Sequence, residues 1–126
     1  MADTETGKPG VDPEAVVREY YDRVDREDVE GLLELFADDV RYDRPGQAAI
    51  EGIEALRAFY ERDRPLEDGS HEVVHVLVDG RHVAVRGRFS GVQGGDRVAF
   101  GFADHHEFDA DGLIANRWTY TDRDTV

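Results

Sequence analysis

The hydrophobic pattern of this chain changes its period once, near Pro65. Before Pro65, apolar residues recur at spacings of three and four, which is typical of helices with one buried side. After Pro65 they alternate with polar residues, which is typical of strands with one buried face. Strands that follow one another in hairpin order form an antiparallel sheet, and the preceding helices cover one face of that sheet. The sequence therefore predicts an α+β fold, with three N-terminal helices packed on a strongly curved, mostly antiparallel sheet.

Three helices are predicted in the first half of the chain. The first begins at Asp12-Pro13, because Asp suits the N-cap and Pro suits the first helical position. The second follows Asp28 and includes Phe36, and the third covers about Ile50–Arg62. A short strand, Val40–Tyr42, is predicted between the second and the third helix.

Four strands are predicted after Pro65, with glycine-containing turns between them. The strands are Val73–Val78, His82–Val92, Arg97–Phe108 and Leu113–Thr121, and the hairpin turns are at Asp79-Gly80, Gly94-Gly95 and Asp111-Gly112. We expect a single domain over residues 12–121, preceded by a disordered acidic tail at 1–11 and followed by a C-terminal tail at 122–126.

The charge balance limits the partners of the protein. Its 126 residues include 29 Asp and Glu against 15 Lys and Arg, a formal net charge of −14. Such a field repels phosphate backbones and anionic lipid, so we expect no nucleic-acid and no membrane partner. Lys8 is the only lysine, which indicates a salt-adapted surface, with a plain acidic surface as the alternative. Without an apolar run of about 18 residues or a secretion signal, we expect a soluble cytoplasmic protein.

Missing motifs exclude several kinds of site. The chain has no Cys, which excludes disulfides, thiolate nucleophiles, Cys-zinc sites and iron-sulfur clusters. His105 and His106 are adjacent on a predicted strand and point to opposite faces, so they cannot bind one ion together. Neither a phosphate-binding glycine loop nor a GxSxG nucleophile motif occurs. We therefore expect no metal and no other cofactor.

Asp104 breaks the pattern of its strand. Alternation places it on one face with Phe100, Phe102 and His106. Conflicts between local pattern and burial are expected at functional sites. If Asp104 is buried without a cation, its pKa rises and the neutral acid can donate a hydrogen bond. The alternative is a structural network in which Asp104 pairs with Arg117 or His106.

Tyr20 and Asp43 are two further candidates. Tyr20 lies on the apolar stripe of the first helix, and its hydroxyl needs a partner if it is buried. Asp43 follows a predicted strand end and precedes a turn, where polar side chains can reach the mouth of a cleft and accept a proton. The alternatives are a core tyrosine and an ordinary surface aspartate.

Four segments together carry a family resemblance. They are Val16-Val17-Arg18-Glu19-Tyr20, Leu35-Phe36-Ala37-Asp38-Asp39-Val40, Gly52–Tyr60, and Asp104–Phe108 with the following Asp111-Gly112-Leu113-Ile114 and Trp118. Over nearly all of Pro13–Thr121 the sequence resembles the nuclear transport factor 2-like superfamily, in its branch of ketosteroid isomerases and SnoaL-like polyketide cyclases. The resemblance implies a cone-shaped half barrel that encloses an apolar pocket, usually in a homodimer.

The resemblance also implies roles for single residues. Tyr20 matches the tyrosine of the isomerase oxyanion hole, and Asp104 matches the neutral acid of the isomerases or the catalytic aspartate of SnoaL-like members. The isomerase base falls on Arg44, which cannot act as a base at neutral pH. Asp43 or Asp104 would then replace it, or Arg44 binds an anionic ligand and the chemistry is absent. Arg117 stands where SnoaL-like members often carry histidine. The residues expected to contact a ligand are Arg44, His106, Arg117, Phe89, Phe100, Phe102 and Trp118.

Two functional hypotheses stay open. In the first, the protein is an enzyme that transfers a proton next to a carbonyl without a cofactor, in an isomerisation or a cyclisation. In the second, the same pocket binds a small ligand without turnover, or the domain is a dimeric interaction module. In both, the expected ligand is small and apolar or carbonyl-bearing, and two arginines at the pocket favour an anionic one.

Overall fold

The computed structural model describes residues 12–123 of the chain. Its helices are α1 (Pro13–Asp25), α2 (Val29–Leu33) and α3 (Ile53–Ala58), and α3 continues into a π-helical turn, η1 (Phe59–Asp63). Its strands are β1 (Phe36–Asp43), β2 (Ile50–Glu51), β3 (Leu66–Asp79), β4 (His82–Gln93), β5 (Asp96–Phe108) and β6 (Ile114–Thr121). The strand order in the sheet is β2-β1-β6-β5-β4-β3, and every pair except β1 with β6 is antiparallel.

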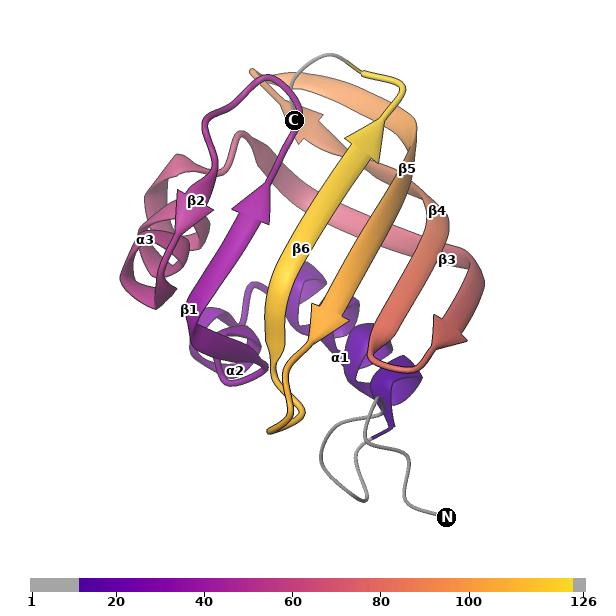
Figure 1. Cartoon of the computed structure of the whole chain (residues 1–126). Coiled ribbons are helices and arrows are strands. Elements are labelled where there is room, and N and C mark those ends of the chain that lie inside the picture. The colour runs from indigo at the N-terminus through magenta and orange to yellow at the C-terminus, as the bar shows by residue number, and fades with distance from the viewer. Residues whose placement is uncertain (1–11, 124–126) are drawn as a thin grey trace.

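The three helices lie on one face of a curled sheet that does not close into a barrel (Figure 1). α1 packs on β3 and β4, while α3 packs on β1. This arrangement confirms the predicted α+β fold, with three helices on a strongly curved, mostly antiparallel sheet. No helix within residues 12–123 is long and apolar enough to cross a membrane.

The four strands predicted after Pro65 and their hairpins are confirmed, but several boundaries are wrong. Phe36 belongs to β1 and not to the second helix, and Ile50–Glu51 forms a strand that pairs with Arg41 and Tyr42. β3 begins at Leu66, because its polar first half is held by main-chain pairing with the far end of β4 and not by a hydrophobic pattern. The tail expected at 1–11 and the last three residues of the C-terminal tail lie outside the described residues.

α1 begins and packs as its sequence predicts. The Asp12 side chain accepts a hydrogen bond from the Glu14 amide at 3.1 Å, and Pro13 occupies the first helical turn. The buried side of the helix consists of Val17, Tyr20, Tyr21 and Val24. Two of these four residues carry a hydroxyl, so α1 brings two phenols into the core.

The covered face of β4 contains a glycine where a larger side chain does not fit. Gly87 lies opposite Phe102 of β5. A Cβ at this position would lie 2.3 Å from the Glu72 carbonyl oxygen and 2.7 Å from the Phe102 ring. The missing side chain therefore lets the Phe102 ring pack directly over the β4 backbone.

We expect Gly87→Ala to lower the free energy of unfolding by about 1–3 kcal/mol, because the added methyl group overlaps main-chain atoms that cannot move away. Urea unfolding of both proteins measures the difference. Gly101→Ala is the matched control, since the nearest atom to its added Cβ lies 3.4 Å away, at the end of the Asp122 side chain. Equal stability losses in the two variants would contradict this explanation.

Candidate functional site

The register of the sheet gathers polar side chains on its covered face. Asp104 on β5 lies opposite Thr119 on β6, and His106 lies opposite Arg117. Tyr42 on β1 lies beside Arg117 in the parallel pairing of β1 with β6. Because side chains alternate along a strand, all five point to the same side as the hydrophobic core. The buried polar residues are Arg44, Asp104, His106, Arg117 and Thr119.

Asp104 accepts hydrogen bonds from three buried donors. Arg117 Nη2 donates to Asp104 Oδ2 at 2.7 Å, and the side chains of this ion pair are 3% and 2% exposed. The Tyr21 hydroxyl donates to the same oxygen at 2.5 Å, and Thr119 Oγ1 donates to Oδ1 at 2.6 Å. The structure therefore shows the paired arrangement, which was one of the two alternatives for Asp104.

The pairing keeps Asp104 ionised. Burial alone raises the pKa of this carboxyl, but the charge of Arg117, the neighbouring His106 and the hydroxyls of Thr119 and Tyr21 outweigh burial and hold the pKa below its ordinary value. Burial also acts to lower the pKa of Arg117, and the charge of Asp104 raises it well above its usual range. At neutral pH the site therefore holds a carboxylate and a guanidinium, and Asp104 does not act as a neutral donor.

The hydrogen-bond directions follow from this ionised carboxylate. Thr119 gives its only hydroxyl proton to Asp104, so the Tyr42 hydroxyl donates to Thr119 at 2.8 Å. Arg44 Nη1 in turn donates to the Tyr42 hydroxyl at 2.6 Å. Tyr21 also gives its only proton to Asp104. The donors on both sides of the carboxylate thus point toward it.

His106 completes the network as a neutral ring. Burial, followed by the charge of Arg117, lowers the pKa of His106 to about 3. Since the Tyr21 proton goes to Asp104, His106 Nε2 must carry a proton and donate to the Tyr21 oxygen, 3.2 Å away. Nδ1 is then unprotonated, and it has no hydrogen-bond partner within the described residues.

The Tyr20–Tyr60 pair and Arg117 supply donors that the network does not use. The Tyr20 and Tyr60 hydroxyls share a short hydrogen bond, and burial raises the pKa of both phenols, so both are neutral. Two neutral phenols have two hydroxyl protons, and the hydrogen bond between them uses one. The other hydroxyl proton of the pair is available to a further acceptor. The Arg117 guanidinium lies 4.4 Å from the ring centres of Tyr20 and Tyr42, and its Nε and Nη1 have no hydrogen-bond partner in the part of the chain that the structure describes.

These groups surround a small inner cavity. Its volume is about 20 Å³, enough for about one water molecule. The residues that line this inner cavity are Tyr20, Tyr42, Arg44, Arg64, Leu66, His71, Phe89, Phe100, Phe102, Asp104, Arg117, Thr119 and Thr121. The structure thus brings together seven of the predicted site residues: Asp104, Tyr20, Arg44, Arg117, Phe89, Phe100 and Phe102.

Three predicted site residues lie elsewhere. The Asp43 carboxylate accepts hydrogen bonds from Arg41 at 3.1 and 3.2 Å, outside the inner cavity. The Trp118 ring packs 5.0 Å from the His105 ring and borders a shallow groove of about 240 Å³. His106 lies in the core behind Tyr21 and does not line the cavity.

Sequence reasoning missed Tyr21, Tyr60 and Thr119. Tyr21 lies on the same apolar stripe of the first helix as Tyr20, and the spacing alone does not show which phenol reaches Asp104. Thr119 lies directly opposite Asp104, so the register of the predicted hairpin could have found it. Tyr60 lies within the predicted third helix, but its contact with Tyr20 arises only through tertiary packing.

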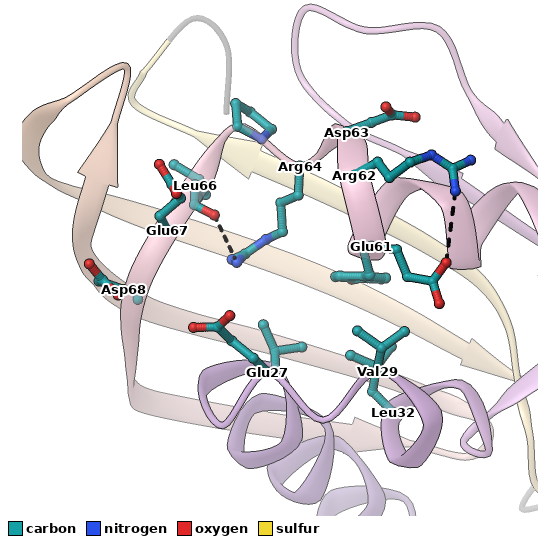
Figure 2. Close-up of a pocket in the computed structure, with 14 residues that line it drawn as sticks. Glu27, Val29, Leu32, Glu61, Arg62, Asp63, Arg64, Leu66, Glu67 and Asp68 are labelled. Atoms are coloured by element: carbon teal, nitrogen blue, oxygen red, sulfur yellow. Dashed lines mark hydrogen bonds and ion pairs between the residues drawn. The ribbon is translucent and has the colours of Figure 1, made fainter.

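A second, larger depression lies next to the inner cavity. Figure 2 shows this outer cleft, which is bounded on one side by the corner between α1 and α2 and on the other by η1 and the start of β3. Its volume is about 750 Å³. The lining consists of Val24, Glu27, Val29, Leu32, Tyr60, Glu61, Arg62, Asp63, Arg64, Pro65, Leu66, Glu67, Asp68 and Gly69. Arg64 and Leu66 border both the outer cleft and the inner cavity.

Within residues 12–123 no group of three or more His, Asp or Glu side chains is placed to hold a metal ion. The ionisable side chains at the inner cavity include the Asp104 carboxylate, the guanidiniums of Arg44, Arg64 and Arg117, and the phenols of Tyr20 and Tyr42.

The chain was compared with known families and structures. The family model described as the SnoaL-like domain matches residues 17–117. No curated protein sequence matches the chain.

Several solved structures share the fold. The epoxide hydrolase/cyclase-like enzyme SalBIII, of pyran ring formation in the polyether salinomycin, is 22% identical, with a TM-score of 0.77 over 86% of this chain and 89% of that one. An LEH-like epoxide hydrolase from M. tuberculosis is 22% identical, with a TM-score of 0.77 over 87% and 82%. An NTF2-like protein of unknown function from Burkholderia pseudomallei K96243 is 21% identical, with a TM-score of 0.79 over 87% and 90%.

We expect the buried His106 to make the protein sensitive to acid. Because its pKa is about 3 in the folded protein, against 6.5 for an exposed histidine, the unfolded chain binds one more proton between these values. Stability is therefore retained above pH 6.5 and falls as the pH decreases from 6.5 toward 3. The stability that comes from the lowered pKa of Asp104 is lost only in stronger acid, as the pH falls below the ordinary pKa of an aspartate and through the lowered pKa of Asp104.

His106→Gln keeps a donor for Tyr21 but cannot take up a proton. It is expected to move the midpoint of acid unfolding down by about half a pH unit to one unit. Circular dichroism of both proteins along a pH series measures the midpoint. His75→Gln, at an exposed position, is the control. An unchanged midpoint in His106→Gln would show that the ring does not control acid stability.

Proposed function

Because the chain belongs to the SnoaL-like domain family, we propose that it is an enzyme that transfers a proton on a small carbonyl compound without a cofactor. One observation carries the proposal. A carboxylate (Asp104), a neutral phenol (Tyr20) and a guanidinium (Arg117) meet at one inner cavity, and two nitrogens of this guanidinium have no hydrogen-bond partner among the described residues.

The proposed reaction begins with a proton next to a carbonyl. Oδ1 of Asp104 accepts a single hydrogen bond and so has a lone pair left to take this proton. The electrons of the broken C–H bond move to the carbonyl oxygen, which accepts hydrogen bonds from Arg117 and Tyr20. Donors fixed at the place where negative charge develops lower the barrier most strongly in a dry site. Return of the proton to another carbon gives isomerisation, and attack of the enolate on a second carbonyl gives cyclisation.

The arrangement favours Asp104 over Asp43 as the base. The Asp43 carboxylate is engaged by Arg41 and does not line the inner cavity, whereas Asp104 does. The isomerase resemblance implied that a neutral Asp104 donates a hydrogen bond to the enolate oxygen. In the proposed reaction Arg117 donates this hydrogen bond instead, since a guanidinium can donate to an enolate while Asp104 stays ionised.

Opening of an epoxide by water is a second candidate. The inner cavity is about the size of one water molecule and lies at the carboxylate. Two of the structural neighbours are described as epoxide hydrolase-like. In this reaction Asp104 takes a proton from water, the water oxygen bonds to an epoxide carbon, and the leaving oxygen accepts a proton from Tyr20.

We expect Asp104→Asn to lower turnover by about 10²–10⁴-fold, because the amide cannot accept the proton. The substrates are a β,γ-unsaturated ketone and a small epoxide, and α-proton exchange in D₂O is followed by NMR. Asp43→Asn is the control and keeps the rate. Tyr20→Phe, which preserves the packing of the ring, is expected to lower the rate about tenfold or more. Binding without exchange or ring opening in the unmodified protein would support the non-catalytic pocket instead.

We also propose that the protein is a homodimer that associates through the uncovered face of the sheet. Leu77 and Tyr120 are exposed there at 62% and 63%, respectively. They border a groove of about 470 Å³ whose lining includes Ala84 and Ala103. Exposed apolar side chains gathered on one sheet face are typical of an interaction surface. Arginines and carboxylates both occur on this face, so a second copy can match its charges across a twofold axis.

Leu77→Glu is expected to weaken self-association by about tenfold or more, because it places a charge in the apolar centre of this face. Sedimentation velocity at several protein concentrations measures the monomer–dimer equilibrium. Ala48→Glu adds the same charge at an exposed position between β1 and β2 and is expected to leave the equilibrium unchanged. A monomeric unmodified protein, or equal effects of both variants, would overturn the proposed interface.

A further inference from the structure

The inner cavity is too narrow to hold a molecule larger than about one water. Its volume is about 20 Å³, and Asp104, Arg117 and Tyr20 are all buried. A ligand must therefore displace part of the wall to reach the carboxylate. Two depressions border that wall: the outer cleft, which shares Arg64 and Leu66 with the cavity, and the shallow groove beside Trp118, which shares Arg44, Thr119 and Thr121.

The two arginines in the wall are held to very different degrees. Arg44 donates to the Tyr42 hydroxyl at 2.6 Å, and its guanidinium lies 4.6 Å from the Phe59 ring centre. Among the described residues, the Arg64 guanidinium donates only to the carbonyl oxygen of Leu66 at 3.4 Å, near the limit for a hydrogen bond, and it lies 5.7 Å from the Phe89 ring centre. Arg64 is also half-buried, while Arg44 is 9% exposed. The wall is thus weakest at Arg64.

We propose that Arg64 is the gate of the active site. Its guanidinium swings from Leu66 and Phe89 into the outer cleft, and the cleft and the inner cavity then become one chamber. This inference rests on the proposed function in one respect, since it assumes that the ligand must reach Asp104.

The outer cleft offers Arg64 a second position. In Figure 2 the Arg64 side chain extends between Leu66 and the middle of the cleft, with Glu27 on the facing wall. Glu27, Glu67 and Asp68 line the same cleft. No carboxylate of the described residues lies within ion-pair distance of Arg64 in the closed arrangement. A guanidinium that leaves a weak hydrogen bond can therefore gain a carboxylate partner.

The outer cleft also borders one of the two paired phenols. Tyr60 lines the outer cleft, and its hydroxyl bonds to Tyr20, which lines the inner cavity. Tyr60 lies in η1, the π-helical turn that ends at Asp63, directly before Arg64. A ligand that moves this wall therefore meets the phenol pair on its way to Arg117.

The charge of the cleft selects the ligand. Five carboxylates and two arginines line it, while Val24, Leu32 and Leu66 provide an apolar floor. Glu61 already pairs with Arg62 at 3.9 Å, so the excess charge is negative. The route thus favours an uncharged or amine-bearing apolar carbonyl compound and disfavours the anionic ligand that Arg44 and Arg117 suggested from sequence. The inner arginines then bind a carbonyl oxygen and not a carboxylate.

A cysteine-labelling experiment tests the gate without any substrate. The chain has no cysteine, so Thr119→Cys provides a single thiol on the inner cavity. Because Thr119 also borders the shallow groove, the reaction rate of this thiol with small methanethiosulfonate reagents reports access to the cavity from either side, and the arginine variants identify the side. Adding Arg64→Ala is expected to raise this rate by about tenfold or more, since minor open states are typically populated to 10% or less. Adding Arg18→Ala, whose side chain is 51% exposed and pairs with Glu14 outside the cleft, is the control and leaves the rate unchanged.

Labelling reagents of different charge test whether the outer cleft selects ligands by their charge. We expect an uncharged methanethiosulfonate reagent to react several-fold faster than the sulfonate reagent in Thr119→Cys with Arg64 intact, and the difference to shrink in high salt. Equal rates would overturn the charge selection.

Other outcomes would overturn the gate itself. Faster labelling in Arg44→Ala but not in Arg64→Ala would place the route at the shallow groove, and no acceleration in either variant would also exclude Arg64. Phe100→Cys supplies an independent thiol on the inner cavity if Thr119→Cys does not fold. Loss of turnover in Asp104→Asn is a separate measurement, so the gate and the proposed reaction can fail independently.

Discussion

The buried ion pair between Asp104 and Arg117 is the interaction on which the rest of this structure depends. Two charges taken out of water cost several kcal/mol each, and attraction offsets that cost only when the remaining donors and acceptors are satisfied. Here the carboxylate is satisfied by donors from α1 and β6 as well as by the arginine. The pair therefore fixes α1 against the sheet and fixes the register of β5 with β6. Well-packed apolar residues often stabilise a core as much as such a pair does, so stability alone does not explain a charged pair at this position.

The unequal satisfaction of the two partners is what makes the site chemically useful. Asp104 accepts three hydrogen bonds, whereas Arg117 uses one of its nitrogens, and its Nε and Nη1 have no partner within residues 12–123. Since buried donors are almost always paired, such groups call for an explanation, and a ligand oxygen provides one. The rings of Tyr20 and Tyr42 hold the guanidinium by cation–π contact in the meantime. The same residue thus keeps the base ionised and is ready to bind the oxygen that becomes negative.

The sequence predicts the fold well, because the change of period near Pro65 depends only on which side chains face the core. It also predicts that Asp104 faces inward, since alternation along a strand is a local property. The partners of Asp104 are not local: Arg117 and Thr119 meet it through strand pairing, and Tyr21 reaches it from a helix more than 80 residues earlier. The protonation state of Asp104 follows from those partners, so the sequence leaves the neutral and the ionised alternatives open. Asp43, in contrast, has a local partner: the side chain of Arg41 lies on the same face of β1 and donates two hydrogen bonds to its carboxylate.

The net charge of −14 has different consequences outside and inside the molecule. Carboxylates dominate the lining of the outer cleft, whereas the inner cavity is lined by one carboxylate, Asp104, together with three arginines. A molecule that enters by the cleft therefore moves from a negative potential to one in which positive groups outnumber the single buried acid. The carboxylates of the outer cleft repel a fully anionic ligand, and the arginines of the inner cavity repel a cation. A neutral molecule with a polarisable oxygen passes the first step and is bound at the second, and an amine is accommodated only at the end of the molecule that stays in the cleft. The charge that excludes polyanions from the surface thus also selects, at the mouth of the site, the carbonyl compounds that its interior can activate.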